Sequence, residues 1–263
     1  MSNSGKNVHR NLTELQAFKY LIATKLWGIK VTYPTADVSL TNYARIAGLA
    51  YVISIMLGIF SVNYVESNLI VPGNETATVA NIMANEELFR VGIVSEIMMY
   101  LLVVLLSWSL YVILKTVNKN LALLALICRI GEAIIGAGVV VLSGLIPLLL
   151  LSAETGLDSE QLPALVGLFL DVRSAGLDIV LIFIGVGGSI FCYLFYKSNY
   201  VPKIWAVWGI FTYLSMLIIS LLSIILPNFP ETIKMVFFAP GGLFELLFGF
   251  WLIFRGVNTR DKV

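Results

Sequence analysis

Hydrophobic residues fall into six long blocks along the chain, and short polar segments separate these blocks. A helix rises about 1.5 Å per residue, so about twenty apolar residues cross the roughly 30 Å hydrocarbon core of a bilayer. Each block reaches that length, and the pattern therefore predicts six transmembrane helices. They are expected at residues 43–64, 91–114, 121–151, 174–196, 204–226 and 235–254.

The composition strengthens this interpretation. Hydrophobic residues make up 59% of the chain and charged residues only 13%, which would leave a soluble domain covered in apolar surface. Backbone polar groups in lipid must be satisfied within the segment, so the blocks predict an all-α integral membrane protein. The net charge of +1 decides nothing about nucleic acid, but no basic run resembles a nucleic-acid-binding patch, so we expect the lipid bilayer and not nucleic acid as a partner.

The six blocks are expected to form one domain, residues 43–257, between an N-terminal arm (1–42) and a short cytoplasmic tail (258–263). In the arm, Leu12, Leu15, Ile22 and Leu26 recur at helical spacing among lysines. This pattern is typical of an amphipathic helix that lies on an anionic membrane surface. A loosely ordered basic arm that only sets the topology is the alternative interpretation.

Lysine and arginine positions predict the orientation, because short cytoplasmic connections are enriched in these residues. Basic residues gather before the first block, in the second and fourth connections, and after the last block. The first, third and fifth connections are acidic, although the fifth holds Lys234 beside Glu231. The pattern therefore places both termini in the cytoplasm.

Several charged residues lie inside the predicted spans. At about 1.5 Å per residue, Arg129 lies about 12 Å and Glu132 about 16 Å from the start of the third span, close to the middle of the bilayer. Glu245 is also central, whereas Glu96 and Asp178 fall in the outer half of their spans. Near the outer boundary lie Arg90, Asp171 and Arg173.

An ionised side chain in lipid costs about 2.5 to 3.5 kcal/mol even on the mildest scale, so these groups should face the bundle interior. Arg129, Glu132 and Gly136 share one helix face through their spacing, as do Gly242, Glu245 and Gly249. We interpret the deep set (Arg129, Glu132, Glu245, Glu96 and Asp178) as an outward-facing polar cavity. Arg90, Asp171 and Arg173 would form its outer rim. The alternative is that these residues are ion pairs that only fix helix packing.

The sequence also excludes several chemistries. The only histidine, His9, lies in the arm, and no predicted span has an interior lysine. No haem ligand, zinc set or retinal-binding lysine is therefore expected, and we predict no metal and no cofactor. No nucleotide-binding or hydrolase motif is present. Binding of a small or lipid-like molecule, proton-coupled transport, metal-independent acid–base catalysis on a lipid, and an accessory role in a membrane complex remain open, and no catalytic residue is assigned.

Six strings in this order resemble one family of bacterial membrane proteins, domain of unknown function 4386, over residues 41–257. They are TNYARIAGLAY, IVPGNETATVANI, LFRVGIV, LYVILKTVNKNLALLALICRIGEA, YKSNYVPK and GGLFELLFGFWLIFRGV. The resemblance implies a plasma-membrane protein whose family pattern includes Arg90, Arg129, Glu132 and Glu245. Many members have histidine where this chain has Arg173, a departure that argues against proton transfer at this position. The resemblance implies no established activity.

Overall fold

The computed structural model describes residues 36–152, 158, 161–226 and 229–258 of the 263-residue chain. The chain divides into two compact units, residues 1–38 and 39–263, and the helical bundle belongs to the second unit. The amphipathic segment predicted between Leu12 and Leu26 lies outside the described residues, as does nearly all of the predicted tail.

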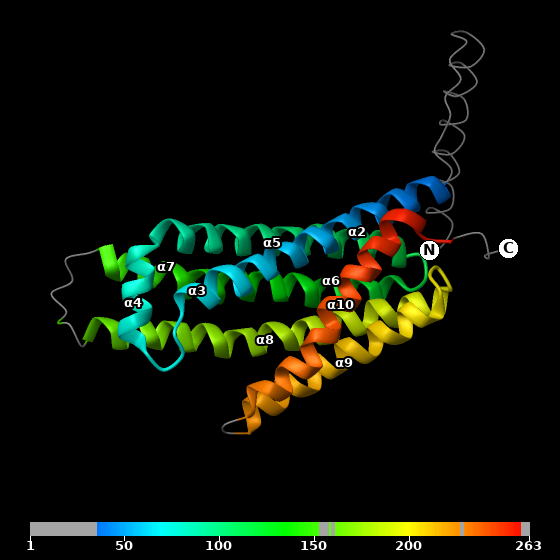
Figure 1. The fold of residues 1–263 in the computed structure, drawn as a ribbon. Helices are drawn as coiled ribbons and strands as arrows, with labels where there is room; N and C mark the ends of the chain where they lie inside the picture. Colours follow the sequence, from blue (N-terminus) through cyan, green and yellow to red (C-terminus); the bar gives the residue numbers. More distant parts are fainter. Residues whose placement is uncertain (1–35, 153–157, 159–160, 227–228, 259–263) are drawn as a thin grey trace, which may run out of the picture. The chain divides into compact units, whose positions relative to one another are not determined.

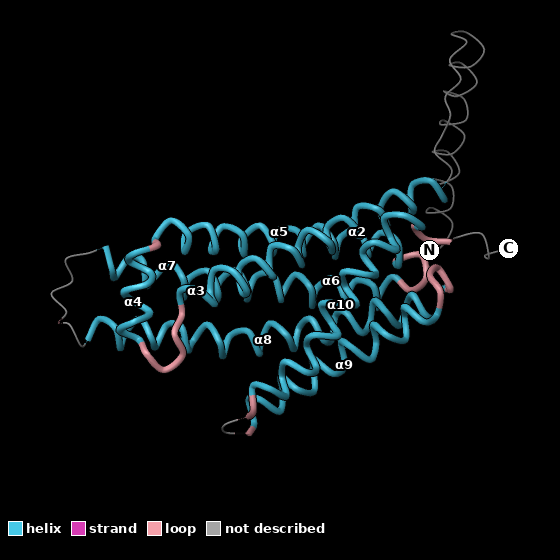
Figure 2. Tube along the Cα trace, viewed as in Figure 1, coloured by secondary structure: helices cyan, strands magenta, loops and turns pink. Residues whose placement is uncertain are grey.

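The described residues form helices joined by short connections and contain no strand (Figures 1 and 2). Six of the helical segments are long and apolar enough to cross a membrane, which confirms the predicted six-span helical bundle. Two of these spans each contain a short π-helical turn. The spans are α2 (Ala36–Phe60) with η1 (Ser61–Glu66) and α3 (Ser67–Leu69); α5 (Glu86–Leu114); α6 (Lys119–Ile135) with η2 (Gly136–Val141) and α7 (Leu142–Ser152); α8 (Gln161–Ser198); α9 (Lys203–Ile225); and α10 (Glu231–Arg255).

Several helices extend beyond the predicted boundaries: the first span covers residues 36–69 instead of 43–64, and α5 begins at Glu86 instead of residue 91. Three further differences concern α4, α8 and α10. A short helix, α4 (Glu75–Ala84), occupies the first connection, where the Asn74 side chain accepts a hydrogen bond from the Ala77 amide. Helix α8 starts at Gln161 instead of residue 174, and Pro163 lies in its first turn, where a missing N–H breaks no helical bond. Helix α10 starts at Glu231, so Lys234 belongs to a span and not to a connection.

Helix α8 is the centre of the packing, because it contacts both α6 and α9 (Figure 1). Helix α5 packs on α6, and α10 packs on α9. Aromatic side chains fill the core between these helices, including Phe195, Tyr213, Phe244 and Phe248. Helices α2 and α10 cross at Gly48, where an added Cβ would lie only 2.5 Å from the Gly249 carbonyl oxygen. Close approach at small residues is typical of helix contacts in membranes.

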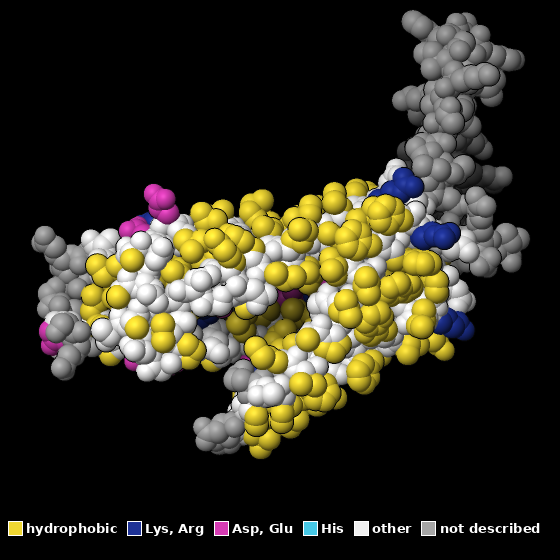
Figure 3. Space-filling view, viewed as in Figure 1, with side chains coloured by type: hydrophobic (Ala, Val, Ile, Leu, Met, Phe, Trp, Pro, Cys, Tyr) yellow, Lys and Arg dark blue, Asp and Glu magenta, His cyan; other side chains and the backbone are white. Residues whose placement is uncertain are grey.

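The outer surface of the bundle suits lipid and not water. Large apolar side chains cover the face shown in Figure 3, and Ile204, Met235 and Phe254 are each more than 70% exposed. On the described surface in this view, lysines and arginines gather at the end of the bundle where α10 ends, and acidic side chains gather at the opposite end.

Helix α10 also contains Pro240, which is followed by Gly241 and Gly242.

Candidate functional site

A cavity of about 450 Å³ lies among α2, α5, α6, α8 and α10. Figure 3 shows this face of the molecule hollowed beside α10. Most of the cavity wall is apolar, and polar groups reach it at only a few points. The polar lining residues are Ser54, Tyr100, Glu132, Ser174, Asp178 and Lys234.

The first charged group beside the cavity is the Arg129 cluster, which consists of Tyr51, Arg129, Glu132, Tyr213 and Glu245. Arg129 and Glu132 lie three residues apart on α6, and Arg129 Nη1 is 2.8 Å from Glu132 Oε2. Their side chains are only 4% and 2% exposed. Glu132 lines the cavity, so one member of this buried ion pair is in reach of a molecule inside it.

Helix α8 makes room for Arg129. A Cβ at Gly187 would lie 3.0 Å from the Arg129 Cγ and 3.1 Å from the Ala125 carbonyl oxygen, so a larger residue would force the arginine stem to shift by a few tenths of an ångström. Two turns after Arg129, Gly136 is the first residue of η2, and a Cβ added there would overlap the Tyr100 ring of α5. Glycine thus allows close packing at both positions, of α8 on Arg129 and of Tyr100 on Gly136.

Glu245 joins the Arg129 cluster through tyrosine. The Tyr213 hydroxyl on α9 donates a 2.7 Å hydrogen bond to Glu245 Oε1 on α10. The same hydroxyl is 3.1 Å from the Tyr51 hydroxyl on α2. Arg129 is also close enough to Glu245 for their opposite charges to interact. Groups from four helices therefore meet at this depth of the bundle.

The second group is the Arg173 cluster, which consists of Ser61, Glu66, Glu96 and Arg173. Arg173 on α8 pairs with two carboxylates, Glu96 on α5 and Glu66 at the end of η1, with 3.1 Å from Arg173 Nε to Glu66 Oε1. The Ser61 hydroxyl donates a 2.6 Å hydrogen bond to Glu96 Oε1. The other oxygen, Glu96 Oε2, is buried and accepts no hydrogen bond from the described residues.

The π turn η1 explains how Ser61 and Glu66 reach the same cluster. Residues five apart in an α-helix point about 140° away from each other around the axis. A π turn closes its hydrogen bonds between residues five apart, so these residues lie nearly one above the other. Ser61 and Glu66 are the first and last residues of η1, and both face Glu96 and Arg173.

The third group joins α8, α9 and α10 at the cavity wall. Asp178 Oδ2 accepts a 2.8 Å hydrogen bond from the Ser223 hydroxyl and lies 3.2 Å from Lys234 Nζ. Asp178 and Lys234 both line the cavity. The sequence predicted Lys234 in an outer connection, before a span that begins at residue 235. That boundary is wrong, because α10 begins at Glu231 and Lys234 lies in its first turn.

The structure thus divides the predicted site residues into separate groups. Arg129, Glu132 and Glu245 lie together, Glu96 lies with Arg173, and Asp178 lies with Lys234. The predicted rim residues do not form one ring. Arg90 is exposed and pairs with Glu86 on its own helix, Asp171 is exposed, and Arg173 is mostly buried.

Six partners were not predicted: Tyr51, Ser61, Glu66, Tyr213, Ser223 and Lys234. Glu66 lies two residues beyond the predicted end of the first span, and the hydropathy pattern does not indicate a π turn there. The position of Lys234 inside the helix could have been predicted, because no helix-breaking residue separates Lys234 from the apolar segment that continues to Pro240. For the two tyrosines the sequence carries no signal that separates them from other buried aromatic residues.

One known protein family matches the segment that contains this arrangement. The sequence pattern described as "Domain of unknown function (DUF4386)" matches residues 46–256. The chain belongs to this family. The DUF4386 match confirms the predicted resemblance and includes every residue of the three charged groups. No curated protein and no solved structure matches the chain.

No metal centre emerges from this DUF4386 bundle within the described residues, where no three histidine, cysteine, aspartate or glutamate side chains come together as ligands. The absence of metals and cofactors remains a prediction from the sequence. What the described groups offer is carboxylates, hydroxyls and one lysine at the wall of an otherwise apolar cavity.

Proposed function

We propose that this protein binds a small lipid-like molecule in the cavity among α2, α5, α6, α8 and α10. The observation that carries the proposal is the lining: a mostly apolar volume of about 450 Å³ whose wall includes Glu132, Asp178 and Lys234. Ligand sites typically combine apolar walls with a few polar groups that fix orientation. An amphipathic ligand would place its polar end at these three residues.

Charge in the membrane supports the same conclusion. Charged side chains are costly inside a bilayer, so those within spans face the bundle interior or a cavity and are typical of binding or transport sites. Here Glu132 belongs to an ion pair that is almost fully buried, yet it also reaches the cavity wall. Lys234 and Asp178 do the same from the neighbouring helices.

A pair of adjacent substitutions on α8 tests the proposal. Ser174 and Ala175 are both exposed, but only Ser174 lines the cavity. We expect native mass spectrometry of the wild type to show a co-purified molecule. Ser174→Trp should fill the cavity, and this molecule should then be absent. Ala175→Trp should keep it, and neither variant should change the melting temperature by more than about 1 °C. A molecule retained equally by both variants, or by neither the variants nor the wild type, contradicts the proposal.

Catalysis is the second candidate, and one observation favours it. The Glu132 carboxylate and the Tyr100 side chain both line the cavity, where an acid–base pair could act on a bound lipid without a metal. Turnover of a bound lipid, followed by mass spectrometry, would distinguish an enzyme from a binding protein. An accessory subunit, in contrast, would co-purify with a protein partner and keep its function when Glu132 is neutralised.

The proposal includes an orientation in the bacterial plasma membrane, with both termini in the cytoplasm and the Arg173 cluster toward the outside. The segregated charges in Figure 3 support it. Glu87 and Lys197 are exposed residues at opposite ends of the spans. On intact cells, an impermeant thiol reagent should label Glu87→Cys and not Lys197→Cys, and the wild type with its native Cys128 and Cys192 serves as the background. Labelling of Lys197→Cys alone would reverse the orientation.

A further inference from the structure

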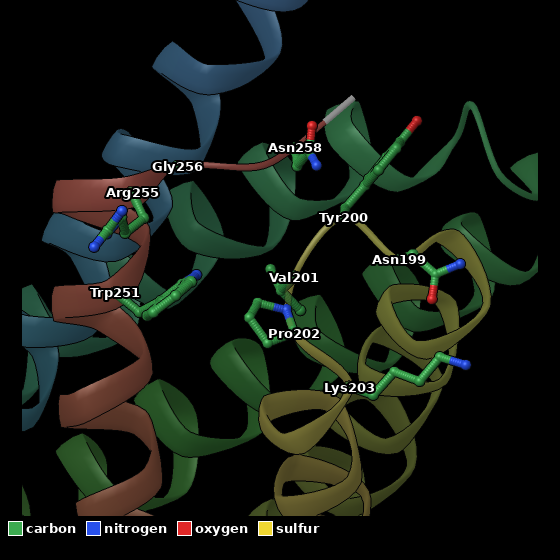
Figure 4. Close-up of a pocket in the computed structure, with 9 residues that line it drawn as sticks. All are labelled: Asn199, Tyr200, Val201, Pro202, Lys203, Trp251, Arg255, Gly256 and Asn258. Atoms are coloured by element: carbon green, nitrogen blue, oxygen red, sulfur yellow. The ribbon is translucent and has the colours of Figure 1, made fainter. Parts of the chain in front are cut away.

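Two pockets of similar volume differ in how their charged groups are placed. One, of about 430 Å³, lies where α8 turns into α9, and Figure 4 shows the charged ends of Lys203 and Arg255 pointing to opposite sides of it. The cavity among α2, α5, α6, α8 and α10 instead brings Glu132, Asp178 and Lys234 to the lining of one space. The charges around this cavity can therefore indicate which kind of ligand it binds.

The two arginine clusters contain more carboxylates than cations. In the Arg129 cluster, one arginine is within electrostatic reach of two carboxylates, those of Glu132 and Glu245. The Arg173 cluster has the same ratio, one arginine to two carboxylates. When fully ionised, each cluster therefore has an excess of negative charge. Uncompensated charge is costly inside a bilayer, so a further cation or a proton must offset it.

This excess of negative charge acts at the cavity wall. Tyr100 lines the cavity and lies near both clusters. Three carboxylates and one guanidinium are near enough to act electrostatically on its hydroxyl, namely those of Glu66, Glu96, Glu132 and Arg173. Asp178 and Lys234, in contrast, form an ion pair, so their charges offset each other. We therefore expect a negative potential on the side of the cavity formed by α5 and α6.

Glu132 also has acceptor capacity left for a ligand. Its side chain lines the cavity, is only 2% exposed and forms an ion pair with Arg129 at 2.8 Å. Even so, Glu132 Oε2 accepts no hydrogen bond of good geometry from the described residues. Buried polar groups are nearly always hydrogen-bonded, and a carboxylate can accept about four such bonds. A ligand that donates N–H groups would satisfy this carboxylate and offset its charge.

We propose that the cavity binds an amphipathic amine, with its ammonium group at Glu132 and Tyr100 and its alkyl chain along the apolar wall. An ammonium group supplies three donors and a positive charge, and the Tyr100 ring can face it in a cation–π contact. The alkyl chain packs against lining residues such as Met99, Leu181 and Phe238. This inference rests on the binding role proposed above and names the class of ligand.

The test compares amphiphiles that share a dodecyl chain and differ in the polar end. Dodecylamine, dodecyltrimethylammonium, dodecanol and dodecanoate are titrated, below their micellar concentrations, into the wild type in a neutral detergent, and binding is followed by melting temperature and native mass spectrometry. Dodecylamine should bind roughly tenfold more tightly than dodecanol, because only the amine makes charged hydrogen bonds. Dodecyltrimethylammonium, which has no N–H donor, should be intermediate, and dodecanoate should bind most weakly.

Two variants locate the site of the preference. Glu132→Gln should weaken the binding of dodecylamine roughly tenfold and change that of dodecanol little. Glu86→Gln removes a carboxylate from an exposed residue outside this cavity and should behave like the wild type. Melting temperatures without amphiphile establish that each variant is folded. If Glu132→Gln does not fold, the amphiphile series on the wild type still decides between an amine and the other classes.

The possible outcomes separate this inference from the proposed function. Equal binding of dodecylamine and dodecanol, tighter binding of dodecanoate, or unchanged amine binding in Glu132→Gln would overturn the amine assignment and leave the cavity as a site for another lipid. Equal binding of the two cations would overturn the role of the N–H donors. If Ser174→Trp weakens the binding of none of the amphiphiles, the proposed function itself fails.

Discussion

Replacement of Arg129 by alanine is expected to lower the melting temperature in detergent by roughly 10 °C, because removal of one partner of a buried ion pair costs about 3 kcal/mol or more. The change leaves the Glu132 carboxylate without its partner 2.8 Å away, in a side chain only 2% exposed. Adding Glu132→Gln removes the uncompensated charge. The double variant should therefore regain most of the lost stability.

A matched control for this experiment lies on α5. Arg90 forms an ion pair with Glu86 at similar distance, 2.6 Å, but both side chains are about half exposed. Exposed pairs contribute little, so Arg90→Ala should change the melting temperature by no more than about 2 °C. If the double variant at Arg129 and Glu132 melts no higher than Arg129→Ala, the two residues do not stabilise each other.

Arg173→Met is expected to have a similar or larger effect, because one arginine neutralises two carboxylates. Without it, Glu66 and Glu96 face each other across the contact between the first two spans, and Glu96 keeps only its hydrogen bond from Ser61. We expect a loss of roughly 10 °C in melting temperature. Arg173→Lys should recover only part of it, because an ammonium group lacks the planar fork that contacts two carboxylates at once.

Whether charge explains the loss of stability in Arg173→Met can be tested in the same variant. Neutralisation of both acids in the background of Arg173→Met, with Glu66→Gln and Glu96→Gln, should raise the melting temperature again. A triple variant as unstable as Arg173→Met would mean that Arg173 stabilises the bundle by packing and not by charge. Full stability of Arg173→Met itself would remove the cluster as a structural element.

Hydropathy was sufficient to predict the six spans, because each span must be apolar over the thickness of the bilayer whatever it packs against. The cost of buried charge was likewise sufficient to predict that Arg129, Glu132 and Glu245 face the interior. Both arguments concern one helix and its solvent, and a single sequence carries that information directly.

Partners across helices could not be predicted in the same way. Whether Arg173 meets Glu66 depends on the π turn at residues 61–66 and on how far α8 extends beyond its apolar core. Whether Lys234 meets Asp178 depends on where α10 begins. Relative register is also set by close approaches such as that of Gly48 to Gly249, which leave no periodic pattern in the chain.

We expect the Pro240–Gly241–Gly242 segment of α10 to act as a hinge beside the cavity. Proline has no amide hydrogen to donate to the preceding turn, and the two glycines after it leave the backbone less restrained than any other residue would. Lys234, Met235 and Phe238 lie in the part of α10 before this segment and form one wall of the cavity. The ion pair between Lys234 and Asp178 connects this part of α10 to α8. An added Cβ at Gly242 would meet nothing within 4 Å, so the hinge can be stiffened by Gly242→Ala without a clash. We therefore expect Gly242→Ala to slow the exchange of the proposed ligand with the surrounding lipid without lowering the stability of the bundle.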